Sequence, residues 1–197
     1  PEPEVKEKTI AEIIAAENGE YTTTAVVVGV NAQSFLIKDE TGIMLVYNGY
    51  TWTADVKVGD KVKITGSSTV YGKAKQFGQG AKYEVVGSET VEYGQDKELA
   101  AADCDAYAKL EIVAPEYVKV TGKLAVSGNY YNLTIEGATI IGSITYPANA
   151  DEVKALNGKT IEVTGFVTGT SGSDKYLNLL ALEVKAVDGG EVNPEPD

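Results

Sequence analysis

The chain has 197 residues and a formal net charge of −12, and all 17 of its basic residues are lysines because arginine and histidine are absent. This composition excludes imidazole acid–base chemistry and histidine metal sites, and it provides no guanidinium for bidentate phosphate binding. A single cysteine, Cys104, allows no internal disulfide, and we expect it to be a small buried apolar residue. No segment approaches the roughly 20 consecutive apolar residues of a membrane helix, so we expect no membrane insertion by this chain.

Both ends of the chain are rich in proline and acidic residues, a composition typical of extended linkers. We assign residues 1–8 and 189–197 to such linkers. Much of the negative charge lies in these ends and in the joint at 88–97, because residues 9–87 carry eight acids and seven lysines. We expect the sequence to be part of a longer precursor whose export signal has been removed.

The first half begins with a short predicted helix over 9–16, where Thr9 is a candidate N-cap residue with Glu12 three positions later. Alternating and β-branched residues then predict five strands, with an aromatic connector over 48–56 between the third and the fourth; the strands are 21–30, 34–38, 43–47, 61–66 and 82–86. This is the layout of an OB barrel.

The second half repeats the same order. The passage Val58–Gly66 returns as Leu156–Gly165, and each copy has a glycine turn, a lysine and an alternating strand that ends in Thr-Gly. The predicted strands here are 117–127, 130–136, 139–144, 160–168 and 176–187, with a connector over 148–156 and either a helix or an extended lead-in over 99–110. The sequence therefore predicts an all-β protein of two tandem five-stranded OB-fold (Greek-key) barrels with little helix, one over 9–92 and the other over 93–188.

Framework motifs in both halves carry a family resemblance. Those of the first half resemble the OB-fold domains attached to secreted bacterial nucleases and to surface proteins of Bacteroidetes: Thr9–Glu12, Phe35–Gly42 and Val58–Gly66. Those of the second half resemble companion OB-like domains of the same surface proteins: Val118–Gly122, Gly128–Leu133 and Asn157–Lys159. The resemblance implies an exported module at the cell surface or in the periplasm, lipid-anchored through a removed N-terminal segment, with further domains of the same precursor as partners. It brings no catalytic residue.

One candidate binding segment is residues 67–83, predicted to be a long loop between the fourth and fifth strands. It holds three lysines, three aromatic residues and no acid. Tyr71, Lys73, Lys75 and Phe77 are its candidate ligand-binding residues, because single-strand binders combine stacking faces with lysines that attract phosphate. The alternative is a solvated hairpin whose lysines protect an exposed strand edge.

A second candidate cluster contains Tyr47, Tyr50 and the single tryptophan, Trp52, beside asparagine and threonine. Aromatic faces next to amides and hydroxyls are suited to a sugar, although the same rings could close the open end of the barrel. In the second half, strand alternation sends one of Tyr130 and Tyr131 outward, and Tyr130 is the candidate there.

We therefore expect a non-enzymatic binding module for an extended oligosaccharide. Single-stranded nucleic acid, bound through the segment 67–83, and a structural spacer without a ligand are the two alternatives. No cofactor or metal is expected, because Asp39-Glu40 and Asp103 with Asp105 lack the regular ligand offsets of a calcium loop. The spacer would lose support if both candidate clusters, 67–83 and 47–52, were exposed and formed one continuous groove across the two halves.

Overall fold

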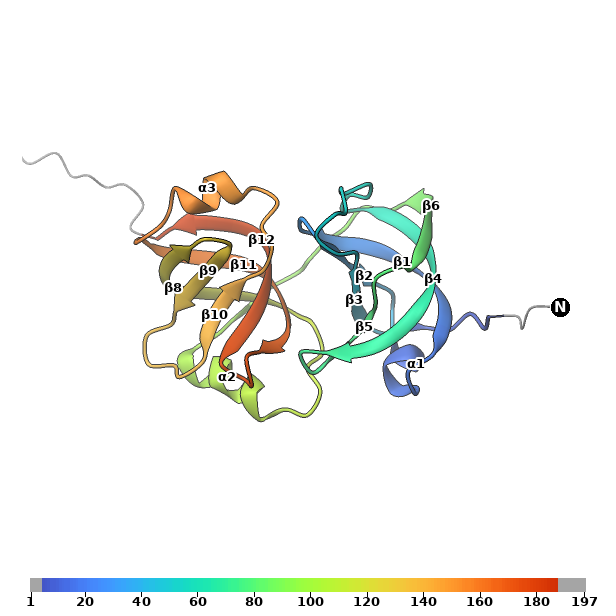
Figure 1. Cartoon of the computed structure of the whole chain (residues 1–197), viewed down its shortest axis with the longest axis horizontal. Helices are drawn as coiled ribbons and strands as arrows, with labels where there is room; N and C mark the ends of the chain where they lie inside the picture. Colours follow the sequence, from blue (N-terminus) through green and yellow to red (C-terminus); the bar gives the residue numbers. More distant parts are fainter. Residues whose placement is uncertain (1–4, 188–197) are drawn as a thin grey trace, which may run out of the picture.

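Two closed β-barrels lie side by side in the computed structural model, which describes residues 5–187 (Figure 1). Among these residues, no helix is both long enough and apolar enough to cross a membrane. Of the predicted end linkers, residues 1–4 and 189–197 lie outside the described residues, whereas Glu7 forms an isolated bridge with Thr22.

The first barrel closes in the OB strand order, β1–β2–β3–β5–β4–β1, and its β3 and β5 are parallel. Its elements are α1 (Ile10–Ala15), β1 (Glu20–Val30), β2 (Ser34–Lys38), β3 (Ile43–Tyr47), β4 (Asp60–Tyr71), β5 (Ala74–Phe77) and β6 (Lys82–Ser88). The predicted helix is confirmed as α1. Thr9 is its N-cap, as predicted, and the Thr9 hydroxyl accepts a hydrogen bond from the Glu12 backbone N–H at 3.3 Å. The Asp39 carboxylate accepts a second one, from Ile10 N at 2.8 Å.

The prediction of a long loop over 67–83 is wrong. Strand β4 continues to Tyr71 and turns back through Gly72 and Lys73 into β5, which closes the barrel against β3. Both turn residues have positive φ, 57° and 64°, as a two-residue type I′ hairpin requires. The predicted fifth strand, β6, pairs only with the first half of β4 and lies at the edge of the sheet.

The second barrel has the same topology, with β8–β9–β10–β12–β11 closing onto β8. Its elements are β7 (Lys97–Glu98), α2 (Ala101–Ala106), the 3₁₀ helix η1 (Tyr107–Lys109), β8 (Glu116–Ser127), β9 (Tyr130–Thr134), β10 (Ile141–Ile144), α3 (Ala150–Lys154), β11 (Thr160–Ser171) and β12 (Tyr176–Ala186). Of the two alternatives predicted for 99–110, a helix or an extended segment, the structure has the helix, as α2 and η1. The connector 148–156 contains helix α3.

Each barrel has its own apolar core, built by strand alternation. The repeated passage supplies Val62 and Ile64 to the first core and Ile161 and Val163 to the second, which confirms that it forms the fourth strand of each barrel. Cys104 is fully buried in the second core, and burial raises its pKa to about 11, so the thiol stays protonated at neutral pH.

A third apolar cluster joins the two barrels. Val28 and Leu36 of the first barrel pack against Phe166 and Leu180 of the second, and all four are buried. From the segment between the barrels, the hydroxyl of Tyr93 donates to Val28 O at 2.8 Å. The barrels are therefore packed together rather than only tethered, as their adjacent placement in Figure 1 shows.

Candidate functional site

The candidate site lies on one face of the first barrel, the face on which OB folds bind ligands, where the second barrel covers this face only in part. On β2, β3 and β5 of the first barrel, alternate residues face outward toward the second barrel, and these strands form the face on which OB folds bind ligands. Leu36 on this face packs into the interface with the second barrel. Ser34, Tyr47 and Gln76 on the same face border an open cleft instead.

The cleft has a volume of about 420 Å³ and is lined by both barrels. The first barrel contributes Ser34, Leu45, Tyr47, Tyr71 and Gln76, and the second contributes Asn129, Tyr130, Ser143, Ile144, Thr145, Tyr146, Thr168, Ser171 and Asn178. Each of these side chains is aromatic, aliphatic, amide or hydroxyl, and none is charged. The lining can therefore stack on flat faces and exchange neutral hydrogen bonds, but it offers no ionic partner.

Four tyrosines gather around this cleft. Tyr71 and Tyr130 are 67% and 71% exposed, on opposite barrels, and Tyr146 is 45% exposed. Burial raises the pKa of Tyr146. The negative charges that Tyr47, Tyr71 and Tyr130 would carry when deprotonated raise it further, because these three hydroxyls lie near that of Tyr146. The Tyr146 hydroxyl therefore stays protonated at neutral pH and can both donate and accept hydrogen bonds.

The first barrel holds Tyr146 in an unusual backbone conformation, with φ of 43°. Positive φ is uncommon for a bulky residue and persists only where the surroundings impose it. Here the backbone N–H of Ala32 donates to Tyr146 O at 2.8 Å, and the side-chain amide of Asn31 donates to Thr145 O at 3.1 Å. The cleft is therefore shaped by contacts between the two barrels.

Three of the predicted site residues meet in the cleft: Tyr47, Tyr71 and Tyr130. Tyr131 is buried in the second core, as the alternation argument predicted. The sequence analysis did not select Tyr146. It lies two residues beyond the end of β10, and the burial patterns of the two third strands align Tyr47 with Thr145, so a position-by-position comparison of the two halves would not have found it.

The two lysines predicted as ligand-binding residues of the segment 67–83, Lys73 and Lys75, bind other parts of the protein. The ammonium of Lys75 donates to Ala16 O at 2.7 Å, and burial lowers its pKa. Lys73 forms a 2.6 Å ion pair with Asp174 and also donates to Ala108 O. Both ammonium groups therefore have partners within the protein and are not part of the cleft lining.

The remaining predicted aromatic residues lie away from the cleft. Phe77 is fully buried in the first core. Trp52 packs on Phe35 with ring centroids 5.8 Å apart, and its indole N–H donates to the Tyr83 hydroxyl at 2.9 Å. Tyr50 is 83% exposed and is not among the residues that line the cleft.

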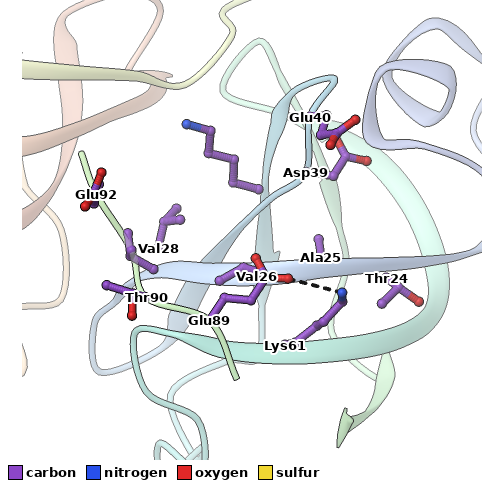
Figure 2. Close-up of a pocket in the computed structure, with 12 residues that line it drawn as sticks. Thr24, Ala25, Val26, Val28, Asp39, Glu40, Lys61, Glu89, Thr90 and Glu92 are labelled. Atoms are coloured by element: carbon purple, nitrogen blue, oxygen red, sulfur yellow. Dashed lines mark hydrogen bonds and ion pairs between the residues drawn. The ribbon is translucent and has the colours of Figure 1, made fainter. Parts of the chain in front are cut away.

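Figure 2 shows a second cavity, of about 410 Å³, beside β1 and the segment 89–92. Two of its charged groups are paired within the protein: Lys61 pairs with Glu89 at 3.2 Å, and Asp39 is partly buried, which raises its pKa, but accepts backbone hydrogen bonds that lower the pKa overall. Lys38, Glu40 and Glu92 also line the cavity. The residues that line it include no aromatic side chain. Within residues 5–187, no group of acidic or cysteine side chains is arranged to hold a metal ion. The cleft between the barrels is therefore the stronger candidate.

No protein-family model and no curated protein matches the chain. Among solved structures, it is similar to the tetrameric p202 HIN2 domain, with 11% identity over 93% of this chain and 98% of that chain and a TM-score of 0.43. It is also similar to a murine DNA-binding protein bound with double-stranded DNA, with 11% identity, 87% and 100% coverage and a TM-score of 0.41. A multidomain protein with nucleic acid binding domains from Streptococcus pneumoniae has 12% identity, 83% and 73% coverage and a TM-score of 0.25. Similarity at this level assigns neither a family nor a function.

Proposed function

We propose that the chain is a non-catalytic binding module whose inter-barrel cleft takes a neutral oligosaccharide. The observation that carries this proposal is the uncharged lining with tyrosines from both barrels around it. An exported, cell-surface setting is part of the proposal and is supported only by the sequence resemblance.

The lining suits the two kinds of surface that a sugar ring has. The C–H groups of a pyranose form an apolar face that can lie on an aromatic ring, and aromatic side chains combine such a face with a polar tip. The sugar hydroxyls need amide and hydroxyl partners around the rings, and Gln76, Asn129 and Asn178 lie in the same cleft. Small-molecule sites commonly combine apolar surface with a few polar groups in this way.

Nucleic acid fits the cleft less well. Its affinity comes largely from lysine and arginine contacts to phosphates, and the cleft lining has neither. The lysines that favoured this alternative, Lys73 and Lys75, bind Asp174 and the carbonyl oxygens of Ala108 and Ala16. The cleft across both halves argues against the spacer alternative, although Tyr50, Trp52 and Phe77 of the two predicted clusters do not line it.

Direct titration of the described two-barrel unit tests the proposal. Neutral cello-, malto-, manno- and xylohexaose are compared with oligo-dT and with duplex DNA, because three of the similar structures are described as complexes with double-stranded DNA. We expect a hexaose to bind with an affinity that does not change with salt. Tyr71→Ala and Tyr130→Ala should each weaken it about tenfold or more, if stacking contributes as much as it does for a nucleic-acid base.

Tyr50→Ala is the matched control, since Tyr50 is also a largely exposed tyrosine but lies outside the cleft lining, and it should leave hexaose binding unchanged. Binding of oligo-dT or duplex DNA that falls steeply with salt and is lost in the Tyr71 and Tyr130 variants would replace the sugar with nucleic acid. Absence of binding to every probe would leave the spacer as the function.

A further inference from the structure

We infer that Gln76 is the residue that reads the hydroxyl pattern of the ligand in the cleft, an inference that rests on the proposed function. Gln76 lies at the centre of β5, opposite Leu45 of the parallel strand β3 and Thr69 of the antiparallel strand β4. Its backbone is therefore fixed on both sides. An amide on a strand held this firmly presents its polar atoms in a defined place.

Strand alternation turns Gln76 away from the core of the first barrel. The next residue, Phe77, is fully buried in that core, so the Gln76 side chain points to the opposite face and lines the cleft. Gln76 is nevertheless only 7% exposed, because the walls of the cleft surround it. It therefore lies deep in the cleft, whereas Tyr71 and Tyr130 lie at the rim.

Several other polar groups in the lining are already used by the protein. The hydroxyl of Ser34 lies 2.8 Å from Asn31 Oδ1, that of Thr145 donates to Leu179 O at 3.1 Å, and that of Ser171 lies 3.0 Å from Asn178 Oδ1. The side-chain amide of Gln76 makes no hydrogen bond to any of residues 5–187. Among residues 5–187, Asn48 Nδ2 is the one buried side-chain polar atom without a hydrogen-bond partner, so the amide atoms of Gln76 are reached by solvent in the cleft and not sealed off from it. A ligand is the natural partner for this amide.

The chemistry of the amide narrows the ligand. A carboxamide places an acceptor oxygen beside a donor NH₂, and this pair matches two neighbouring hydroxyls of a pyranose, each of which can donate and accept. A phosphate can only accept, so it would leave the amide oxygen unpaired. With the tyrosine rings nearer the surface, Gln76 is placed to meet the hydroxyl edge of a ring that stacks on them.

The test measures both binding and stability, because a residue kept for a ligand and a residue kept for the fold behave differently. Gln76→Leu retains most of the volume and removes both hydrogen-bonding groups. We expect it to weaken hexaose binding about tenfold or more, as the sugar hydroxyls lose their partner, while Tm stays the same or rises. Gln76→Glu keeps two acceptors and should retain hexaose binding better than Gln76→Leu does.

Gln95→Leu, at an exposed position on the segment between the barrels, is the matched control and should change neither quantity. If the wild type binds a hexaose and Gln76→Leu binds it equally well, the inference is wrong while the proposed function stands. A fall in Tm of several degrees for Gln76→Leu would also overturn it, because the amide would then serve the fold. If the wild type binds no hexaose, the proposed function fails and the sugar assignment of Gln76 fails with it.

Discussion

Asn31 and Gln76 are two buried amides with opposite roles. The side-chain oxygen of Asn31 accepts hydrogen bonds from Gln33 N and Ser34 N at 3.0 and 2.8 Å, and its NH₂ donates across the interface to Thr145 O. The Asn31 side chain therefore stabilises the turn after β1 and binds the second barrel. The amide of Gln76 is unused by the protein. Burial alone does not separate a structural amide from one available to a ligand, but the list of partners does.

Asn31→Ala should destabilise the protein by about 2–3 kcal/mol, because it leaves the buried N–H of Ser34, the half-buried N–H of Gln33 and the carbonyl of Thr145 without their partner. Urea denaturation measures the change. Asn18→Ala, at an exposed position, should have little effect. An equal loss of stability in both variants would show that the cross-barrel hydrogen bonds contribute nothing specific.

At the scale of an element, the β4–β5 hairpin is one of the parts of the first barrel that contact the second. Its turn is bound through the backbone, since Thr170 N donates to Gly72 O at 2.9 Å and Val113 N donates to Lys73 O at 2.8 Å. A Cβ at Gly72 would collide with Thr170 O, so the close approach requires glycine as well as positive φ. In Figure 1 this hairpin extends from β4 and β5 toward the second barrel.

The ion pair at this hairpin predicts a pH dependence. The Lys73 ammonium, through its hydrogen bond to the carboxylate, lowers the pKa of Asp174 below its usual value of 3.8 in the folded state. The pair therefore stabilises the fold fully above that pH, and the stabilisation is lost as pH falls through the lowered pKa. The difference in Tm between the wild type and Asp174→Asn should be largest at neutral pH and should shrink below pH 3.8.

Thermal melts across this range provide the measurement, with Asp151→Asn as the control because Asp151 on α3 makes no ion pair within residues 5–187. A difference in Tm that stays constant from neutral pH to strong acid would exclude a contribution from the charge of Asp174.

At the scale of the whole molecule, the interface turns two similar barrels into one unit. Val28, Leu36, Phe166 and Leu180 face away from their own barrel cores and are buried only because the barrels meet. Apolar side chains that would be exposed on separate barrels are a driving force for docking. The cleft exists only in the docked arrangement, because its lining comes from both barrels.

We expect calorimetry to show a single unfolding transition for the wild type, since each barrel loses buried apolar surface if the other unfolds. Leu180→Glu should divide it into two transitions, because the substitution places a carboxylate in the interface and leaves the separate core around Leu177 and Leu179 intact. Leu110→Glu is the control, at a leucine that is already exposed. Two transitions in the wild type would contradict a coupled unit.

Most of the barrel architecture could be predicted from the sequence. The alternating residues of the repeated passage placed the fourth strand of each barrel, and β2 and β3 were predicted with their observed bounds. The β4–β5 hairpin was missed because glycine and lysine in a polar stretch also fit a loop. Its strand character comes from pairing with β3, a partner distant in the sequence.

The candidate site could be predicted only in part. The sequence by itself determined two OB barrels and the presence of tyrosines near their ligand faces, because periodicity and turn residues act over a few positions. The tertiary structure decided that Lys73 and Lys75 serve the fold, that Tyr146 joins Tyr47, Tyr71 and Tyr130, and that Gln76 faces an uncharged cleft. These outcomes depend on how two barrels pack against each other, and contacts between residues far apart in the chain leave no local pattern in the sequence.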